Sequence, residues 1–358
     1  MPLYRPIQAC IHLSAFQHNL NVARTLAPQS KVLAIVKSNG YGHGIETVAR
    51  ELAQADGFGV ASIDEGMALR QRGFLHPIVL LEGVFSEAEW PLVAQHRLEA
   101  SLHNWQQLEW LQRSRIRTPL TLWLKVDTGM HRLGFEVSEL DKVLAAVEAL
   151  PMPVQVCWMS HLASAEESEA FSMQQFSVFE KMTAARSDMK SLANSAAIQR
   201  YPQMHYDWVR PGIMLYGAGA EARLGLQPTM SLISKIISLK WVPAGESVGY
   251  GQAWVAPRRS LIAAVAAGYG DGYPRCAPAG TPVLIHGQRM PMAGRVSMDM
   301  LSVDVTELAE RVAIGDSAIL WGQGLPVDEI AQACGTIGYE LLCNVTQRVP
   351  RLDCEQVG

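Results

Sequence analysis

The sequence predicts a (β/α)8 TIM-like barrel followed by a mostly β C-terminal domain, which is an α/β architecture in two parts. Two observations predict it. Between residues 30 and 217, eight short apolar runs alternate with helix-like stretches, as in a closed barrel. After residue 230, strand-like runs separated by glycine and proline turns replace this alternation. A doubly wound open sheet is the rival arrangement for the first part.

The eight apolar runs have the length of buried strands. They are VLAIV (32–36), GFGVAS (57–62), PIVLLEG (77–83), LEASLHN (98–104), LTLWLKVD (120–127), VQVCWMSH (154–161), KSLANS (190–195) and GIMLYG (212–217). Helical patterns lie between them, and several begin with serine, a frequent N-cap residue. Examples are the segments 86–97, 138–150 and 168–186. The barrel is therefore predicted to span residues 1–230.

Residues 231–358 are predicted to form the mostly β domain. Its strand-like runs are SLISKIISLKWV (231–242), SLIAAVAAGYG (260–270), TPVLIHG (281–287), LSVDV (301–305) and SAILWGQG (317–324). The main helical signal here is VDEIAQACG (327–335). Residues 1–10 precede the first barrel run, and pairing with the C-terminal domain is an alternative placement for them.

Composition excludes several classes of protein. The chain has 358 residues, of which 49% are hydrophobic and 18% charged, so it can bury a sizeable core. A net charge of -4 without a basic block argues against nucleic acid as a partner. No signal peptide pattern or run of 18 apolar residues is present, so we expect a cytoplasmic protein that does not use a membrane.

Cysteine and histidine patterns point to no metal centre. The six cysteines form no C-x-x-C pair, and we expect them to be reduced and mostly structural. No cluster of His, Cys, Asp and Glu has the spacing of metal ligands. The sequence therefore predicts no bound metal.

Polar side chains stand at or near the carboxyl ends of five predicted strands, where a barrel gathers its active site. They are Lys37 and Tyr41, then Lys125, Asp127 and Arg132, then His161, then Asn194 and Ser195, and finally Arg210 and Gly212 beside the last run. Ordinary loop polarity explains any one of them. All five groups together predict an active site.

Lys37 is the sharpest candidate, because it ends a buried strand where a charged amine is costly. One interpretation is that its ammonium reaches water along its aliphatic stem. The other is a desolvated amine that forms a Schiff base with a carbonyl substrate or with pyridoxal phosphate. The glycines that follow in KSNGYGHG (37–44) would let backbone N–H groups approach a phosphate. No G-x-G-x-x-G, Walker A, H-E-x-x-H or G-x-S-x-G motif offers another chemistry.

Nine segments, in order and over nearly the whole chain, resemble the alanine racemase family. They are VKSNGYGHG, LKVDTGMHRLGF, MSHLASAEE, ANSAA, DWVRPGIMLYG, VGYG, AAGYGDGYPR, AGRVSMDM and RVPR. The resemblance implies an isomerase that interconverts L-alanine and D-alanine with pyridoxal 5'-phosphate. It also implies a homodimer in which each active site is completed by the partner's C-terminal domain.

The resemblance assigns two bases on opposite faces of the substrate, because racemisation removes a proton from one face and returns it to the other. Lys37 would hold the cofactor as a Schiff base and act as one base, and Tyr250 of the partner subunit would be the other. The implied cofactor-binding set is Lys37, Tyr41, His161, Asn194, Ser195, Arg210, and the backbone N–H groups of Gly212 and Ile213. Within this set, Arg210 would face the pyridine nitrogen with His161 behind it.

The resemblance also implies how the substrate is held. Arg132 and the backbone N–H of Met298 would bind the substrate carboxylate, and Tyr269 would help form the entrance. Lys125 matches a lysine that is often carbamylated in this family, where it positions the arginine.

Two departures from the family pattern bear on the site. Ser38, Asn39 and Gly40 stand where members usually have Ala-Asn-Ala or Ala-Asp-Ala, so Gly40 is predicted to loosen the backbone beside Tyr41. Gln347 stands where many members have a tyrosine that narrows the site. Serine or a larger amino acid is therefore an alternative substrate, because one group in a small pocket is worth only about 1–3 kcal/mol.

Other functions remain as alternatives to racemisation. A non-catalytic pyridoxal phosphate carrier would keep Lys37 and the phosphate contacts but would not need Tyr250 or Met298. An amino-acid decarboxylase of related architecture lacks its usual glycine-rich phosphate signature here, and a cofactor-free Schiff-base lyase leaves ANSAA and RPGI unexplained. The sequence does not separate D-alanine biosynthesis for peptidoglycan precursors from D-alanine breakdown.

Overall fold

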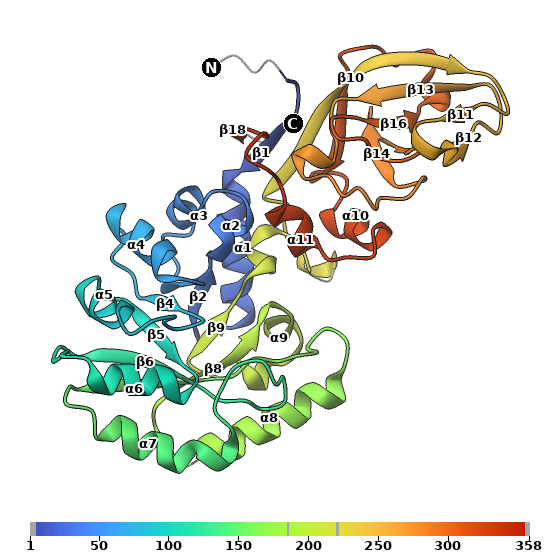
Figure 1. The fold of residues 1–358 in the computed structure, drawn as a ribbon. Helices are drawn as coiled ribbons and strands as arrows, with labels where there is room; N and C mark the ends of the chain where they lie inside the picture. Colours follow the sequence, from blue (N-terminus) through green and yellow to red (C-terminus); the bar gives the residue numbers. More distant parts are fainter. Residues whose placement is uncertain (1–4, 185, 220–221, 355–358) are drawn as a thin grey trace.

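The computed structural model describes residues 5–184, 186–219 and 222–354. It confirms the predicted architecture, with a closed barrel of eight parallel strands and a mostly β C-terminal part (Figure 1). The barrel strands are β2 Lys31–Ile35, β3 Gly57–Val60, β4 Ile78–Leu80, β5 Glu99–Leu102, β6 Leu120–Lys125, β7 Val154–Met159, β8 Met189–Asn194 and β9 Trp208–Arg210. Pairing of Val32 in β2 with Val209 in β9 closes the barrel.

Helices cover the outside of the barrel (Figure 1). They are α1 Leu13–Leu26, α3 Ile45–Glu51, α4 Ile63–Gln71, α5 Glu89–Gln95, α6 Trp105–Arg113, α7 Leu140–Glu148, α8 Glu169–Thr183 and α9 Ser195–Arg200. Strands such as β3 are buried on both faces, which explains their continuous apolar runs. Ser168 caps α8 by accepting a hydrogen bond from the N–H of Phe171 at 3.3 Å, as its position before a helical pattern predicts.

The predicted eighth strand at 212–217 is wrong. The eighth strand is β9 Trp208–Arg210, and Ile213–Tyr216 forms a 3-10 turn, η3. Pro211 lacks an N–H and ends the strand. The apolar run after it is buried because α1 covers it, with Phe16 packed edge-on against Tyr216 at 5.8 Å. A short buried turn and a short buried strand have the same apolar pattern.

The C-terminal part is built on an eight-stranded sheet in which β15, β14, β17, β10, β1 and β18 are neighbours in that order. Strands β13 and β16 extend it from β10. The bounds are β1 Gln8–His12, β10 Met230–Val242, β13 Ser260–Val265, β14 Pro282–Ile285, β15 Gln288–Pro291, β16 Leu301–Asp304, β17 Ser317–Trp321 and β18 Arg351–Cys354. Strand β1 thus lies in this sheet, antiparallel to β10 and parallel to β18, although it precedes the barrel in the chain.

A small hairpin and two helices complete the C-terminal part. They are β11 Ser247–Val248, β12 Trp254–Val255, α10 Val327–Ala333 and α11 Gly338–Cys343. Figure 1 shows α10 and α11 between the sheet and the barrel. At this junction, Arg351 donates a hydrogen bond to the carbonyl of Gly42 at 3.0 Å. The C-terminal part therefore contacts the segment that follows β2.

Cys10 and Cys354 form a disulfide that joins β1 to β18, so the expectation that all six cysteines are reduced is wrong for this pair. The two residues are 344 positions apart, and only the pairing of β1 with β18 brings their Cα atoms to 5.4 Å. Spacing in the sequence carries no sign of such a contact.

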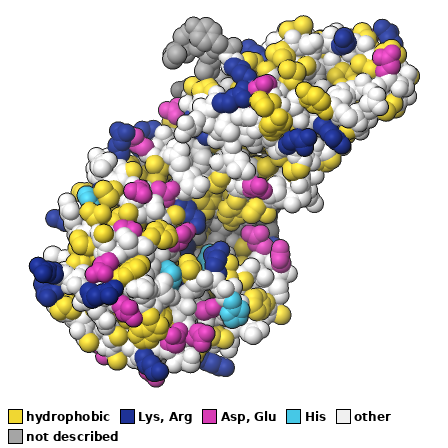
Figure 2. All heavy atoms as spheres, in the orientation of Figure 1, with side chains coloured by type: hydrophobic (Ala, Val, Ile, Leu, Met, Phe, Trp, Pro, Cys, Tyr) yellow, Lys and Arg dark blue, Asp and Glu magenta, His cyan; other side chains and the backbone are white. Residues whose placement is uncertain are grey.

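On the face drawn in Figure 2, Lys and Arg side chains are interspersed with Asp and Glu. Among the described residues, no helix combines the length and the apolar composition of a membrane span.

Candidate active site

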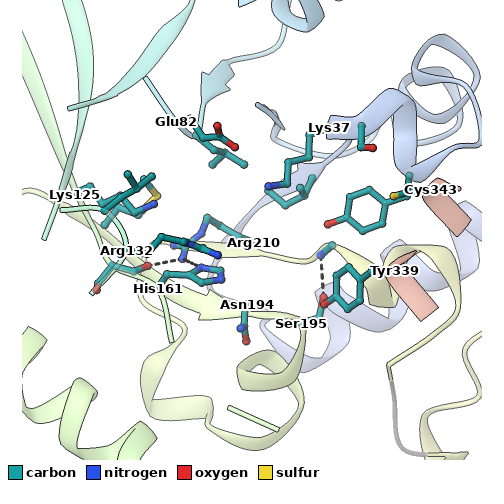
Figure 3. Close-up of a pocket in the computed structure, with 18 residues that line it drawn as sticks. Lys37, Glu82, Lys125, Arg132, His161, Asn194, Ser195, Arg210, Tyr339 and Cys343 are labelled. Atoms are coloured by element: carbon teal, nitrogen blue, oxygen red, sulfur yellow. Dashed lines mark hydrogen bonds between the residues drawn. The ribbon is translucent and has the colours of Figure 1, made fainter. Parts of the chain in front are cut away.

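A cavity of about 560 Å³ opens at the carboxyl ends of the barrel strands (Figure 3). Its volume falls in the range of small-molecule sites. Nine of the predicted site residues line it: Lys37, Tyr41, Lys125, Arg132, His161, Asn194, Ser195, Arg210 and Gly212. The structure therefore brings together side chains from five different strand ends.

Lys37 comes two residues after the end of β2 at Ile35 and begins an unusual turn, α2 Lys37–Tyr41. Residues 38–41 are all left-handed, with φ angles of 55°, 53°, 62° and 48°. This conformation costs about 1–2 kcal/mol at each residue other than glycine. Asn39 helps to hold the turn by accepting a hydrogen bond from the N–H of Ile45 at 2.9 Å. Strain of this kind is characteristic of functional sites.

Gly40 does not loosen this turn, contrary to the prediction. It is buried at φ 62°, and a Cβ placed on it would lie 2.7 Å from Cγ2 of Val48. Glycine is needed here because it accepts the left-handed backbone and leaves room for the Val48 side chain.

Tyr41, Ser195 and Gly212 form a polar end of the cavity. The Tyr41 ring is stacked on Tyr216 with 4.4 Å between ring centres, and its hydroxyl oxygen lies beside Gly212. Ser195 Oγ accepts a hydrogen bond from the N–H of Gly212 at 2.9 Å. Burial raises the pKa of Tyr41, so its hydroxyl stays protonated and can donate a hydrogen bond. Hydroxyl groups beside a backbone without a Cβ suit a phosphate.

Asn194 has a local structural contact within this group. Its side-chain oxygen accepts a hydrogen bond from the N–H of Ala197 at 3.0 Å and caps α9. The cap places Ser195 at the first position of the helix, facing Gly212. Ile213 lies in η3, directly after Gly212, and does not line the cavity.

Arg210, which is buried, and His161, which is partly buried, lie side by side on one side of the cavity. Arg210 donates hydrogen bonds to Ser191 Oγ and to the carbonyl of Ser160, both at 2.6 Å. Burial lowers the pKa of Arg210 to about 10, so it stays charged at neutral pH. It also lies 3.4 Å from Nδ1 of His161, which must accept because the guanidinium can only donate.

His161 is neutral in this setting. Its pKa is well below the usual value, first because the ring is buried and then because Arg210, Lys125, Arg132 and Lys37 add positive charge. With Nδ1 accepting from Arg210, the ring proton is on Nε2. The imidazole therefore contributes orientation and a donor, not a charge.

Lys125 ends β6 and is 8% exposed. Burial and then the charges of Arg210, Arg132 and Lys37 lower its pKa to about 8, while Glu82 acts in the opposite direction. A substantial fraction of the amine is therefore neutral near pH 8. A neutral, desolvated amine is the form of lysine that reacts as a nucleophile.

Arg132 reaches the cavity from the loop after β6. Asp127 shapes this loop by accepting hydrogen bonds from the N–H groups of Gly129 at 2.9 Å and His131 at 3.1 Å. The N–H of Phe135 donates to the carbonyl of Lys125 at 2.9 Å and closes the loop. Figure 3 shows Arg132, Arg210 and the Lys37 amine directed at one space. The cavity can thus hold two anionic groups, such as a phosphate and a carboxylate.

Two family profiles match the chain in the order of its two parts. The profile "Alanine racemase, N-terminal domain" matches residues 11–220, and "Alanine racemase, C-terminal domain" matches residues 229–353. The chain belongs to the alanine racemase family. This is a family of isomerases, and the resemblance found in the nine sequence segments is confirmed.

Alanine racemases of known sequence and structure are similar over nearly the full chain. An alanine racemase of Nitrosococcus oceani is 48% identical over 351 residues, covering 96% of this chain and 98% of that protein. A biosynthetic alanine racemase of Pseudomonas aeruginosa is 47% identical over 354 residues, covering 97% of this chain and 99% of that protein. The crystal structure of biosynthetic alanine racemase from Pseudomonas aeruginosa superimposes with a TM-score of 0.95 at 46% identity, covering 98% of this chain and 100% of that one. The structure of alanine racemase from Acinetobacter baumannii superimposes with a TM-score of 0.92 at 39% identity, again covering 98% of this chain and 100% of that one.

Among the cavity residues that were not predicted, three have titratable side chains. Glu82 follows β4, and the rule that found Lys37 would also have found it, since it ends the apolar run 77–83. Tyr339 and Cys343 come from α11 in the C-terminal part. Their place at the barrel mouth depends on packing between the two parts of the chain, for which the sequence has no local signal.

Besides Ile213, three predicted residues lie outside the cavity of their own chain. Tyr250, Met298 and Tyr269 are on the C-terminal part, with exposed fractions of 70%, 52% and 38%. Hydrogen bonds from the N–H of Tyr269 to the carbonyl of Ser297 and from Gly270 to Met298 join two of these loops, at 3.0 and 2.9 Å. None of the three lines the cavity that Lys37 lines in the same chain. Gln347 is also exposed and does not line the cavity.

Proposed function

We propose that this protein is a pyridoxal phosphate-dependent alanine racemase that interconverts L-alanine and D-alanine with two bases. The observation that carries the proposal is the similarity of nearly the whole chain to proteins named alanine racemase, at up to 48% identity among those compared. The arrangement of Lys37 in a cavity rich in cations supports it from the geometry.

The residues at the cavity fit pyridoxal 5'-phosphate. Gly212 has no Cβ, so its backbone lies directly beside the hydroxyls of Tyr41 and Ser195, where a phosphate would bind. Arg210 is charged and can donate to the ring nitrogen, with neutral His161 beside it. When bound, the cofactor delocalises the negative charge that forms on Cα when the proton leaves.

In this proposal the side chains divide the work of proton transfer and binding. Lys37 would hold the cofactor covalently until the substrate amine takes its place, and the freed Lys37 amine would then move a proton to or from one face of the substrate Cα. Tyr250 of the partner subunit does the same on the opposite face. Arg132 and the N–H of Met298 of the partner subunit bind the carboxylate, and Tyr269 of the partner subunit narrows the entrance. Lys125 positions Arg132, and its low pKa favours carbamylation of the amine.

A homodimer is part of this proposal because one chain does not bring both bases together. Tyr250, Met298, Tyr269 and Met300 are large side chains left substantially exposed on the C-terminal part. Such a group of exposed apolar side chains is typical of an interaction surface. A second copy of the chain would cover it and complete the cavity.

Racemisation of single-enantiomer amino acids tests the proposal. The purified protein with pyridoxal phosphate would be incubated with L-alanine, L-serine and L-lysine, and the D-enantiomers measured by chiral chromatography, with Lys37→Ala as control. We expect fast formation of D-alanine, little from the other two, and none with the control. Comparable turnover of L-serine or L-lysine would instead show a broad-specificity racemase. No racemisation, despite a borohydride-reducible cofactor adduct on Lys37, would leave the non-catalytic carrier.

The biological role proposed is D-alanine biosynthesis, with D-alanine as a building block of peptidoglycan. Similarity to a relative named a biosynthetic alanine racemase supports this role over D-alanine breakdown. A cytoplasmic location stays a prediction. Deletion of the gene tests the role: a requirement for external D-alanine supports it, and normal growth without D-alanine contradicts it.

A further inference from the structure

A fully buried glutamine, Gln175, lies behind the cavity on α8, which covers the barrel from outside (Figure 1). Its side-chain oxygen accepts a hydrogen bond from the N–H of Ala163 at 2.8 Å. Its Nε2 donates to the carbonyl of His161 at 3.0 Å and to Thr128 Oγ1 at 3.2 Å. Both ends of the amide are thus satisfied, which is required of a polar group at such depth.

The bond to Thr128 begins a chain of hydroxyl groups with one consistent direction. Thr128 Oγ1 lies 2.8 Å from Ser160 Oγ, and Ser160 Oγ donates to the carbonyl of Val126 at 2.8 Å. Since Ser160 uses its one hydroxyl proton for Val126, Thr128 donates its own proton to Ser160. The carbonyl of Ser160 in turn accepts from Arg210 at 2.6 Å. One amide on α8 is therefore connected to three strand ends of the barrel.

Two loops with site residues meet at this network. The loop after β6 includes Thr128 and Arg132, and the loop after β7 includes Ser160, His161 and Ala163. Within the first loop, the bonds of Asp127 and the closure by Phe135 fix its internal shape. The first loop is held to the end of β7 at its start, where the N–H of Val126 donates to the carbonyl of Met159 at 2.9 Å. Farther along, the amide of Gln175 and the Thr128–Ser160 contact join it to the second loop.

At position 175, an apolar side chain of similar length would pack between α8 and the barrel, and it would have no amide that needs hydrogen-bond partners. The inward stripe of α8 also contains Phe179, which makes such a contact. Thr183, on the same stripe, uses its hydroxyl only for the carbonyl of Phe179, one turn back in the same helix, at 2.9 Å. Gln175 differs because its partners are in the two loops and not in its own helix.

We propose that Gln175 is a positioning residue for racemisation, which sets the distance between Arg132 on one loop and His161 with Arg210 on the other. The inference rests on the proposed function for the roles of Arg132 and Arg210. Gln175 touches neither substrate nor cofactor. It acts through the backbone of His161 and the hydroxyl of Thr128. A displacement of about 1 Å in such a site is enough for a large loss of rate.

Gln175→Met tests this, because methionine keeps the length of the side chain and removes every hydrogen bond. Thr183→Val is the matched control: it removes one buried hydrogen bond from the same helix, about 12 Å further along at 1.5 Å per residue. We expect KM for L-alanine to rise about tenfold or more in Gln175→Met, with a smaller change in kcat, because the substrate carboxylate depends on Arg132. Thr183→Val should keep both parameters at the wild-type values.

A second readout does not depend on racemase activity. Hydrogen–deuterium exchange of the cofactor-free protein should become faster in segments 126–135 and 160–165 in Gln175→Met, and stay as in the wild type in Thr183→Val. If no variant or wild-type protein racemises alanine, the proposed function fails while this measurement still tests the connection between the loops. Unchanged exchange in both segments would overturn the positioning role.

Thr128→Val provides an independent variant in case Gln175→Met does not fold. If the two residues act through one network, Thr128→Val should raise KM in the same direction, and the double variant should be no worse than Gln175→Met alone. Additive effects in the double variant would overturn the shared network. Gln175→Met could also keep the wild-type KM and kcat and have the same melting temperature as Thr183→Val. That result would show that Gln175 has only a structural role.

Discussion

The hydroxyl oxygen of Tyr41 lies so close to Gly212 that a Cβ on residue 212 would be only 2.6 Å from it. The Tyr41 ring is stacked on Tyr216, with an angle of 8° between the rings, and cannot move aside without breaking that stack. The close contact with the Tyr41 hydroxyl therefore leaves no room for a Cβ at residue 212.

Gly212→Ala should weaken the binding of pyridoxal phosphate. The added methyl overlaps the Tyr41 hydroxyl, and relief of such overpacking costs about 1–3 kcal/mol. If that cost falls on the bound state, the dissociation constant rises by about 5- to 150-fold. Fluorescence titration of the cofactor-free protein with pyridoxal phosphate measures it.

Gly66→Ala is the control for this substitution. Gly66 lies in α4 (Ile63–Gln71), and a Cβ there would meet only flexible side-chain ends of Leu98 and Leu80, at 3.2 and 3.4 Å. It should bind the cofactor as the wild type does. Wild-type affinity in Gly212→Ala would show that the Tyr41–Gly212 contact does not shape the phosphate end of the cavity.

Gly40→Ala should lower the free energy of unfolding by about 1–3 kcal/mol, measured by urea denaturation. Alanine is strained at φ 62°, and its methyl would lie 2.7 Å from Cγ2 of Val48. In the background of Val48→Ala the methyl has room, so the same Gly40→Ala change should cost less there. An equal cost in both backgrounds would mean that backbone strain alone makes Gly40 necessary.

Most of the barrel could be predicted because each strand is an apolar run that ends in polar residues. The run 120–127, for example, corresponds to β6 Leu120–Lys125, and the same polar end identified Lys125. The last strand was misplaced because β9 has only three residues before Pro211, while the longer apolar run after it belongs to η3. An apolar run in the sequence indicates that a segment is buried, but a buried segment can be either a strand or a turn covered by a helix.

Contacts between distant parts of the chain could not be predicted from local patterns. Tyr339 and Cys343 line the cavity only because α11 packs at the barrel mouth, and Tyr339 lies 5.7 Å from the ring of Tyr41. The pairing of β1 with β18 is of the same kind. The expected roles of Tyr250 and Met298 stay predictions, because they require a second copy of the chain.

The pKa of Lys125 leads to a prediction about stability and pH. Its pKa in the folded protein is about 8, below the usual 10.5, so the native state releases this proton at lower pH than the unfolded state. Below pH 8 the folded protein bears the full cost of a buried charge, and this cost disappears as the pH rises from about 8 to 10.5. Across this window the wild type should gain up to about 3 kcal/mol relative to Lys125→Met.

Urea denaturation of both proteins at pH 7 and pH 10, without cofactor and in buffers free of carbon dioxide, measures this difference. Removing carbon dioxide keeps the Lys125 amine unmodified. Lys142→Met, at an exposed position of α7, is the control and should show no such dependence. A difference between wild type and Lys125→Met that is the same at both pH values would contradict the lowered pKa.

Mixing two inactive variants tests whether the cavity is shared between subunits. Lys37→Ala lacks one base and Tyr250→Phe lacks the other, so each should form inactive homodimers. If Tyr250 acts in the cavity of the partner, a mixed dimer has one site with both bases and one site with neither. Equal amounts, unfolded and refolded together, give mixed dimers as half of the population, so about a quarter of the wild-type activity should return.

The exposure of Tyr250 makes this outcome specific to a shared site. Tyr250 is 70% exposed on the C-terminal part and is absent from the cavity that Lys37 lines in the same chain. If both bases came from one chain, no combination of the two variants would contain an intact site. Refolded mixtures would then be as inactive as their components, although size-exclusion chromatography still showed dimers. Recovery of activity therefore requires both the dimer and the exchange of Tyr250 across it.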